Sequence, residues 1–412
     1  MNIVAFIPLG GKGTRLSSIT GGTPKPLYRI HGESTLFRCC KNLKNFGIEK
    51  VILSIGFKPE NFKEPIKEIA KTFDLEIMVY EEKKPLGECG ALWNFYEYLS
   101  EDFLFINGDL IFNLDFSRLI NYHKRLSSKL TLVTHVSTHP YDSDLVSVPN
   151  GSQIKKLFLK SDSGHRNANG FLGNSGIFLI SKSIIKKIPP PSDLKCSSVF
   201  HHIVNKSFTG GERIYSYNTT EYIKDMGTPS RLKEVEKIIK NGDIDKLCYL
   251  NKQKVLFIDR DNTIIECKKG EYITVNSNIV PMSENIKRIS SFAKNFHFVC
   301  LITNQPQISM GLISLEDLEL IHSEVIEICR KFGLLIDVIS FCPHHPHSGF
   351  KNEIPHLKKD CFCRKPNPGQ LIEQAFHRNI DLSNSYFIGD SKTDKEAAEL
   401  AGCKFTYIQN LK

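Results

Sequence analysis

Short apolar runs alternate with segments of helical spacing through the first 240 residues. The runs are Val4–Leu9, Val51–Ile55, Ile77–Tyr80, Phe103–Ile106 and Leu130–His135. Their length and composition predict strands, and apolar residues recur at helical spacing between several of them. This βα alternation is typical of a mainly parallel sheet with helices on its faces.

The alternation starts again after residue 250. We expect strands at Val255–Ile258, Phe298–Ile302, Val338–Cys342 and Tyr386–Ile388, and helices at Leu315–Phe332 and Gly369–His377. Ahead of them, Ser230–Lys240 predicts a helix that ends at Asn241-Gly242-Asp243. Because 412 residues exceed one ordinary core, the sequence predicts two α/β domains, residues 1–247 and 251–412, with a short linker near Asn251.

Composition narrows the class of protein. Apolar residues make up 41% of the chain and charged residues 24%, which is typical of a soluble globular protein, and no apolar run reaches the length of a membrane span. The first predicted strand begins close to Met1, and the pattern of a secretion signal is missing there. Twelve cysteines without disulfide-like spacing fit a reducing compartment, so we expect the cytoplasm.

Nearly all of the net charge of +9 lies in residues 1–250. A basic surface can attract nucleic acid. The chain has no run of five basic residues, however, and no stretch in which aromatic residues alternate with arginines. Small polyanionic substrates explain the charge more simply, and we expect neither nucleic acid nor a membrane as partner.

A glycine-rich loop follows the first predicted strand. It reads Gly10-Gly11-Lys12-Gly13-Thr14-Arg15-Leu16, and Pro24-Lys25-Pro26 comes shortly after it. Glycines let backbone N–H groups approach phosphate oxygens that a Cβ would block. Arg15 and Lys25 would neutralise a triphosphate and the departing pyrophosphate. The loop is neither a Walker loop nor a dinucleotide fingerprint.

Three further segments make this first candidate site more specific. They are Glu82-Lys83-Lys84-Pro85-Leu86-Gly87, Phe105-Ile106-Asn107-Gly108-Asp109 and Tyr222-Ile223-Lys224-Asp225. Asp109 stands at a strand end, and Asp225 supplies a second carboxylate far along the chain. Two such carboxylates can converge on one Mg²⁺ that bridges a nucleotide and a sugar phosphate.

Together these motifs resemble the sugar-1-phosphate nucleotidyltransferases, particularly those related to mannose-1-phosphate and heptose-1-phosphate guanylyltransferases. The resemblance implies a Rossmann-like sheet and in-line attack of a sugar phosphate on the α-phosphate of an NTP, with loss of pyrophosphate. It implies that Arg15 and Lys25 bind the triphosphate and that Asp109 and Asp225 bind Mg²⁺. The substrate contacts that it implies are Gly10, Gly11, Gly13, Thr14, Glu82, Gly87, Asn107, Lys160 and Asn174.

The chain departs from that family at two places. Glu88-Cys89 stands where the family usually has Thr-Gly, and Leu159 replaces the glutamate that usually precedes Lys160. These changes leave the reaction class intact but leave the sugar and the role of Lys160 open. A non-catalytic nucleotide-sugar sensor on the same fold is the alternative.

A second candidate site follows the strand Val255–Ile258. Side chains two apart on an extended segment face the same way, so Asp259 and Asp261 of Asp259-Arg260-Asp261-Asn262-Thr263 can share one phosphate. Asp259 would attack phosphorus, and Asp261 would protonate the leaving oxygen and then activate water. Like-charge repulsion between carboxylate and phosphate requires Mg²⁺ and a cation.

The partners of Asp259 come from three later segments. Asp390 after Tyr386–Ile388 offers a carboxylate for Mg²⁺ besides those of Asp259 and Asp261, Lys365 offers the cation, and Thr303 offers a hydroxyl to the phosphoryl group. Asp394 would support the metal or begin the next helix.

This second set resembles the haloacid-dehalogenase phosphatases, without room for a large cap domain. With the cysteine clips described next, it is similar to the subgroup that contains heptose-1,7-bisphosphate and histidinol-phosphate phosphatases. The resemblance implies that Arg364 and Asn304 contact substrate beside Lys365. Asn262 and Pro306-Gln307 depart from the family pattern.

Two short clips, Cys342-Pro343-His344 and Cys361-Phe362-Cys363, supply three thiolates and an imidazole. Such a set can close a tetrahedral Zn²⁺ site, which would hold the loop that presents Arg364 and Lys365. The alternative is a group of reduced structural cysteines that lie close together without a metal. His345, His347 or His356 could replace His344 as ligand.

The two halves constrain one another. A phosphatase that removes the 1-phosphate of a sugar would destroy the substrate of the nucleotidyltransferase, whereas one that removes another phosphate would create it. We therefore predict that heptose 1,7-bisphosphate loses its 7-phosphate and that heptose 1-phosphate then receives a nucleotidyl group, with GTP favoured by the resemblance. A hexose-1-phosphate guanylyltransferase fused to another phosphatase is the enzymatic alternative. The oligomeric state stays open, a homo-oligomer included.

Overall fold

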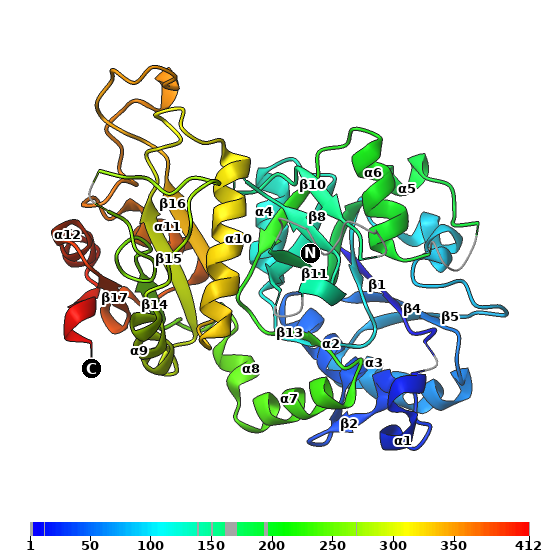
Figure 1. Ribbon diagram of the computed structural model, residues 1–412. Helices are drawn as coiled ribbons and strands as arrows, with labels where there is room; N and C mark the ends of the chain where they lie inside the picture. The colour runs from blue at the N-terminus through cyan, green and yellow to red at the C-terminus, as the bar shows by residue number, and fades with distance from the viewer. Residues whose placement is uncertain are drawn as a thin grey trace.

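The computed structural model describes residues 3–11, 13–137, 140–149, 151–160, 171–192, 197–268 and 270–411. Within these residues the two halves of the chain build separate β-sheets that lie beside each other (Figure 1). Helix α10 (Leu315–Lys331) stands between the two sheets (Figure 1). Of the helices that are described, none combines the length and the apolar character needed to cross a bilayer.

The first sheet is centred on β1 (Val4–Pro8), which pairs in parallel with β4 (Lys50–Ile55) and β6 (Asp102–Ile106). Its strand order is β10-β9-β11-β6-β1-β4-β5, and β8 and β12 complete it beside β11. Separate apolar clusters cover its two faces, as expected for strands buried on both sides. The predicted strands of the first half are confirmed, and β1 delivers the chain into the glycine-rich loop.

The first sheet is mixed, whereas the βα alternation predicted a mainly parallel one. Strand β11 (Leu172–Ser181) runs antiparallel to β6, β8 and β9. The short strands β9 (Leu145–Ser147) and β10 (Lys156–Phe158) lie between β8 and β11 along the chain. An antiparallel return needs no crossover helix, so the period of the sequence does not reveal it.

The remaining elements of the first half flank this sheet or form small additions to it. The other strands are β2 (Arg29–Ile30), β3 (Glu33–Ser34), β5 (Glu76–Glu81), β7 (Leu110–Phe112), β8 (Leu130–Val136), β12 (Tyr215–Asn218) and β13 (Ile223–Asp225). The α-helices are α1 (Ser17–Thr20), α2 (Thr35–Asn45), α3 (Lys63–Phe73), α4 (Phe116–Arg125), α5 (Lys182–Lys187), α6 (Asn205–Thr209), α7 (Pro229–Lys240) and α8 (Asp243–Lys246). The 3₁₀ helices are η1 (Thr14–Leu16), η2 (Lys25–Leu27), η3 (Pro59–Phe62), η4 (Gly90–Tyr98) and η5 (Pro140–Asp142), and η8 (Val199–Val204) is a π-helix. Helix α7 ends as predicted, with Gly242 in the left-handed conformation that only glycine adopts freely.

The second sheet has the order β16-β15-β14-β17-β18, and all of its pairs are parallel. The strands are β14 (Val255–Ile258), β15 (Phe298–Asn304), β16 (Val338–Cys342), β17 (Tyr386–Gly389) and β18 (Lys404–Tyr407). The helices are α9 (Ser283–Ala293), α10, α11 (Gly369–Arg378) and α12 (Lys392–Ala401), with the turns η9 (Pro355–Leu357), η10 (Leu382–Asn384) and η11 (Ile408–Asn410). Since parallel strands end at one edge, the residues after β14, β15 and β17 come together there.

Polar contacts bind the two halves to each other. Glu319 of α10 is 7% exposed and accepts hydrogen bonds from the Ser147 hydroxyl and from the backbone N–H of Val148, at 2.7 Å for the latter. Arg330, near the other end of α10, donates to the carbonyl oxygen of Ser137 at 2.7 Å. Helix α10 of the second half therefore packs directly on the β9 segment of the first sheet.

The carboxyl group of Glu221 lies buried where the two halves join. It accepts hydrogen bonds from the backbone N–H groups of Asp115 and Tyr249 and from the Thr219 hydroxyl. Burial raises the pKa of Glu221 from 4.5 to about 7, against the effect of these hydrogen bonds. The protonated carboxyl group of Glu221 therefore contributes its full stabilisation below pH 4.5. This stabilisation is lost as the pH rises through about 7.

Replacing Glu221 with glutamine should therefore stabilise the protein at high pH. The amide keeps an acceptor for the two N–H groups and can donate to Thr219. We expect the free energy of unfolding at pH 8 to rise by up to about 3 kcal/mol, with little change at pH 5. Denaturant unfolding at both pH values measures this, with Glu97→Gln at an exposed position as control. An equal gain at both pH values would contradict the assignment.

Candidate active sites and a cysteine cluster

In the first candidate site, the glycine-rich loop is packed against Lys25. Gly13 has φ of 63°, and a Cβ there would lie 3.0 Å from Cγ of Lys25. The Lys25 side chain is thus aligned along the loop, and its Nζ lies 3.7 Å from Oδ2 of Asp109. Thr14 and Arg15 follow in η1, and Arg15 acts electrostatically on Asp109. Lys25 and Arg15 therefore both lie beside Asp109 and the described residues of the glycine-rich loop.

The structure also brings Asp109 and Asp225 together. Strand β13 pairs with β7, with Asp225 opposite Leu110, and the N–H of Met226 donates to the carbonyl oxygen of Asp109 at 3.1 Å. Burial raises the pKa of Asp109. The charge of Lys25 opposes this rise, and the neighbouring charge of Asp225 adds to it. The two carboxylates repel each other, and their side chains are 37% and 35% exposed, so a divalent cation has access to both of them.

Arg231 is a residue of this site that sequence reasoning missed. Its Nη1 lies 2.9 Å from both carboxylate oxygens of Asp225. A Cβ on Gly227 would lie 2.6 Å from Oδ1 of Asp225 and 3.6 Å from Nη2 of Arg15, so only glycine fits between them. The signal in the sequence was weak, because Arg231 lies six residues beyond Asp225, in the first turn of α7.

The predicted sugar contacts lie around the same loop. Glu82 accepts from the Ser54 hydroxyl at 2.7 Å and from the N–H of Leu86 at 3.0 Å, and its Oε2 would lie 3.4 Å from a Cβ on Gly10. It therefore braces the glycine-rich loop from behind. Gly87 has φ of 73° in the turn that follows.

Asn107, Asn174 and Lys160 approach from the β11 side. A Cβ on Gly176 would lie 2.9 Å from Nδ2 of Asn107, and Oδ1 of Asn174 accepts from the N–H of Gly176 at 3.0 Å. The backbone N–H of Lys160 donates to Oδ1 of Asp144 at 2.9 Å, and its side chain is exposed.

Glu88, which departs from the family pattern, also belongs to this neighbourhood. Its Oε1 accepts from the N–H of Val199 at 3.2 Å. Burial raises the pKa of Glu88 to about 7; Asp109 and Asp144 add to the rise and Lys160 opposes it. The sequence marked this residue as unusual but gave no role for it.

In the second candidate site, Lys365 bridges two buried carboxylates. Its Nζ lies 2.6 Å from Oδ1 of Asp259 and 2.6 Å from Oδ1 of Asp394. One carboxylate oxygen from each of Asp259, Asp390 and Asp394 lies within 4.8 Å of the others. Burial raises the pKa of Asp259 to about 7, Lys365 opposes the rise, and Asp394 adds to it. Three carboxylates against one lysine leave excess negative charge that a divalent cation would neutralise.

Asp394 caps the start of the next helix, one of the two roles that the sequence left open for it, and its carboxylate also lies in the buried acidic group. Its Oδ2 accepts from the N–H and hydroxyl of Ser391, which closes a capping box at the start of α12. Its other oxygen pairs with Lys365 in the buried group. Asp390 and Asp394 are thereby held on one rigid helix start.

Three predicted residues of this site, Asp261, Asn304 and Arg364, make contacts that the sequence did not predict. The carboxylate of Asp261 lies outside the acidic group and pairs with Arg260. Asn304 donates to the carbonyl oxygen of Lys365 at 3.0 Å and accepts from its N–H at 3.1 Å, so its side chain positions Lys365. Arg364 donates to the carbonyl oxygen of His344 at 3.1 Å.

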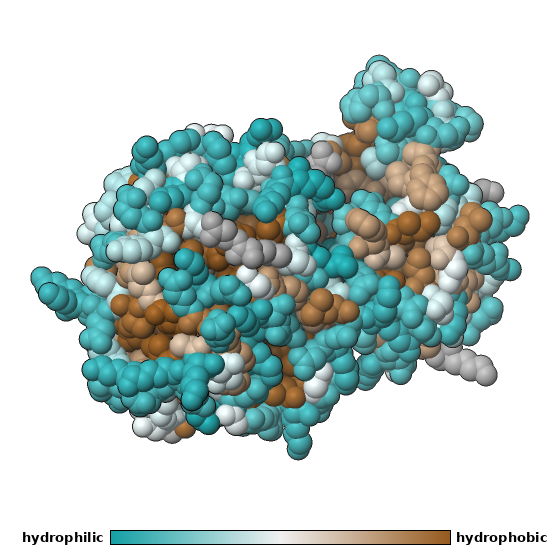
Figure 2. Space-filling view, turned by 180° about the vertical axis from the view of Figure 1, so that it is seen from behind, coloured by the Kyte–Doolittle hydropathy of each residue, from teal (hydrophilic) through white to brown (hydrophobic). Residues whose placement is uncertain are grey.

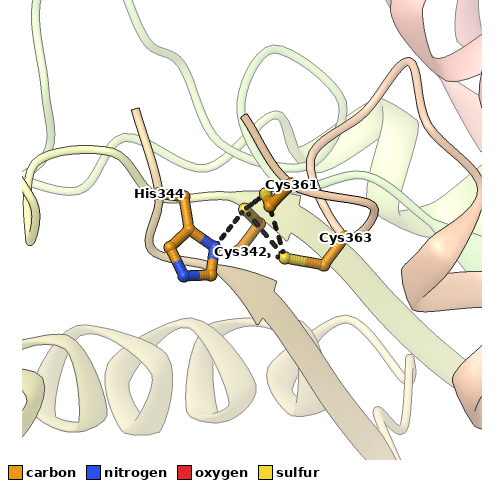
Figure 3. A group of neighbouring side chains, drawn as sticks. All are labelled: Cys342, His344, Cys361 and Cys363. Atoms are coloured by element: carbon orange, nitrogen blue, oxygen red, sulfur yellow. Dashed lines mark hydrogen bonds between the residues drawn. The ribbon is translucent and has the colours of Figure 1, made fainter. Parts of the chain in front are cut away.

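The four predicted metal-binding side chains of the clips converge (Figure 3). The Sγ atoms of Cys342 and Cys361 lie 3.5 Å apart, and each lies 3.3 Å from Sγ of Cys363. Nδ1 of His344 lies 3.3 Å from Cys363 and 3.6 Å from Cys342. These separations exceed a disulfide bond and approach the edge of about 3.8 Å that a tetrahedral zinc–thiolate site has.

The electrostatics of the cluster also suit a cation. Hydrogen bonding from Cys342, with smaller effects of Cys361 and His344, lowers the pKa of Cys363 to about 5. The same hydrogen bond raises the pKa of Cys342, and burial raises the pKa of Cys361. One thiolate is thus favoured before any metal binds. His345 instead bonds to His347, with its Nδ1 3.1 Å from the N–H of that residue. The cluster lies at the base of a loop that projects from the molecule and is mostly hydrophilic on its surface (Figure 2).

Comparison with known proteins separates the two halves. Residues 4–242, more than half of the chain, match the family described as nucleotidyl transferase, and residues 362–410 match the HAD-hydrolase-like family. A D-glycero-beta-D-manno-heptose-1,7-bisphosphate 7-phosphatase from Pseudomonas aeruginosa is 32% identical over 152 residues, which cover 37% of this chain and 79% of that protein.

The first half has relatives of its own. Mannose-1-phosphate guanylyltransferase catalytic subunit beta from Drosophila melanogaster is 27% identical over 228 residues, which cover 55% of this chain and 59% of that protein. This chain therefore spans about three fifths of that relative. The crystal structure of HddC from Yersinia pseudotuberculosis is 26% identical, with a TM-score of 0.47, and the match covers 57% of this chain and 99% of that one.

Proposed function

Because the chain belongs to the nucleotidyl transferase family in its first half and to the HAD-like phosphatases in its second, we propose that it makes a nucleotide-activated heptose. It is a bifunctional enzyme, with a nucleotidyltransferase and a phosphatase in one chain. In our proposal the phosphatase removes the 7-phosphate of heptose 1,7-bisphosphate, and the nucleotidyltransferase joins GMP from GTP to the resulting heptose 1-phosphate. The fusion itself carries this proposal, since the product of one half is then the substrate of the other.

In the first site, the substrate phosphates bind between the glycine-rich loop and the two cations. Lys25 and Arg15 neutralise the triphosphate, and the attack of the sugar phosphate displaces pyrophosphate from the α-phosphorus. Asp109 and Asp225 are the residues that would hold Mg²⁺, which would neutralise phosphate charge. Arg231 holds Asp225 in place by its two contacts. The likeness of this half to a mannose-1-phosphate guanylyltransferase supports GTP as the nucleotide.

In the second site, Asp259 is the nucleophile. Its oxygen bonds to phosphorus as the sugar oxygen departs with a proton from Asp261, and water then cleaves the aspartyl phosphate. Lys365 counters the charge of the phosphate, and Asp259, Asp390 and Asp394 would hold a Mg²⁺ that adds to this effect. Thr303 donates its hydroxyl to the phosphoryl group.

We assign Zn²⁺ to the cluster of Cys342, His344, Cys361 and Cys363. The number and type of donor atoms and their near-tetrahedral spacing support this assignment. Such an ion would tie the start of the projecting loop to the segment that carries Arg364 and Lys365. Its role there is structural, since four protein ligands leave no open position.

The zinc assignment predicts a specific loss of metal. Cys361→Ser should lower bound zinc from about one per chain to well under half, and lower the phosphatase melting temperature, because a structural zinc site contributes to folding. Elemental analysis of the purified protein measures the bound zinc. Cys267→Ser, which replaces a cysteine outside the cluster, is the matched control. A metal content equal to that of the wild type in a folded Cys361→Ser protein would refute the assignment.

The identities of the sugar phosphate and of the NTP are tested with purified protein. Each anomer of heptose 1,7-bisphosphate is offered with each NTP in turn, and hexose 1-phosphates and histidinol phosphate are offered in parallel, with products read by mass spectrometry. We expect GDP-heptose from one anomer. GDP-hexose as the main product would favour the hexose alternative. Nucleotide binding without any pyrophosphate release would favour a sensor.

A further inference from the structure

Arg260, between the two aspartates of the phosphatase motif, is a buried cation. Its side chain is 0% exposed. Its Nε donates to Oδ1 of Asp261 at 2.9 Å and its Nη2 donates to Oδ2 at 3.1 Å, which makes a two-pronged ion pair. Such a fork fixes both the place and the plane of a carboxylate, which a lysine cannot do.

Among the residues that the structure describes, Arg260 forms an ion pair with Asp261 alone. His322 of α10 lies near it, and burial together with the charge of Arg260 lowers the pKa of this histidine well below its usual range. His322 therefore stays neutral beside the guanidinium. The charge of Arg260 is balanced by Asp261, which ties the two side chains to each other.

A second clamp on Asp261 comes from the end of β15. Nε2 of Gln305 lies 3.2 Å from Oδ2 of Asp261 and 2.8 Å from Oγ1 of Thr303. Gln307 in turn donates to Oε1 of Gln305 at 2.5 Å, which orients the amide. Gln305 and Gln307 are both at most 1% exposed, so neither is free to turn away.

We propose that Arg260 and Gln305 are positioning residues that hold Asp261 apart from the buried acidic group and in place for proton transfer. This inference rests on the proposed phosphatase function. In the first step Asp261 gives its proton to the alkoxide as the Asp259–phosphorus bond forms and the ester bond breaks. In the second step it takes a proton from water as the water oxygen bonds to phosphorus, the Asp259–phosphorus bond breaks and inorganic phosphate leaves.

The two-pronged contact holds the carboxylate of Asp261 in one orientation, from which it accepts a proton from water. Loss of the fork should therefore slow the hydrolysis of the aspartyl phosphate with every substrate. It should slow formation of the aspartyl phosphate only where the leaving oxygen needs a proton. 4-Nitrophenyl phosphate and glycerol 2-phosphate separate these two cases, because 4-nitrophenolate leaves without a proton and an alkoxide does not.

The test compares wild type with Arg260→Lys. With glycerol 2-phosphate we expect kcat to fall about 100-fold, the lower range of a lost general acid–base contribution. With 4-nitrophenyl phosphate we expect a fast burst of one nitrophenolate per enzyme, followed by turnover at least about tenfold slower than wild type. Adding Arg260→Lys to Asp261→Asn should cause no further loss, since Arg260 acts through Asp261.

Three outcomes decide the matter. Glycerol phosphate turnover at the wild-type rate, or an additive loss on top of Asp261→Asn, overturns the positioning role. Should Arg260→Lys fail to fold, as judged by lost pyrophosphate release and melting, Gln305→Met tests the same clamp without changing a charge, with the same expected burst. A wild-type protein that hydrolyses neither ester nor heptose 1,7-bisphosphate would instead refute the phosphatase proposal.

Discussion

Release of inorganic phosphate should fall about 10⁴-fold or more when Asp259 is replaced by asparagine, while pyrophosphate release stays within about twofold of wild type. An amide cannot form the aspartyl phosphate, so the reaction loses its nucleophile altogether. The fold should survive, because Lys365 keeps its contact with Asp394 and the replacement removes one of three mutually repelling carboxylates.

The two activities are followed in the same preparation, phosphate from a sugar bisphosphate and pyrophosphate from GTP plus a sugar 1-phosphate. Glu284→Gln on α9, a carboxylate with an 81% exposed side chain, serves as the matched control. Joint loss of both activities in a folded Asp259→Asn protein would argue for one composite site in place of two.

Replacement of Asp225 by asparagine should have the reverse selectivity. We expect pyrophosphate release to fall about 10²–10³-fold, because the site loses a charged metal ligand and the guanidinium of Arg231 loses the closer of its two carboxylate partners. Asp109→Asn should have an effect of similar size, since the same ion would bridge both carboxylates. Phosphate release should be unchanged in both proteins.

Arg231→Lys separates the two causes. If Arg231 only positions Asp225, this variant should raise the Mg²⁺ concentration needed for half-maximal rate about 10- to 100-fold, and excess Mg²⁺ should restore most of the rate. Full activity of Asp225→Asn at ordinary Mg²⁺ concentration would exclude the proposed metal site.

The features that the sequence predicted best are those formed by residues close together in the chain. Strands β14 and β16 have the predicted bounds, because short apolar runs between polar turns leave little choice. The cysteine cluster was also predictable, since each clip brings its donors together within one turn. Asp259, Thr303 and Asp390 could be grouped because parallel strands end at one edge of a sheet.

Contacts between distant segments were not predictable in the same way. Strand β11 pairs antiparallel with β6, a choice that depends on segments about seventy residues apart and leaves no periodic signal. Arg231 and Gln305 belong to the sites through side-chain contacts that only the folded backbone reveals. The two oxygens of Asp394 serve a helix cap and Lys365 at once, a double role that no spacing rule separates.

Phosphorus NMR of wild-type protein incubated with heptose 1,7-bisphosphate and GTP most directly tests the consecutive action of the two sites. The signal of the 7-phosphate should disappear first as inorganic phosphate, heptose 1-phosphate should rise and fall, and the diphosphate of GDP-heptose should follow with equimolar pyrophosphate. Loss of the 1-phosphate as inorganic phosphate, or a nucleotide sugar that still carries the 7-phosphate, would contradict the account.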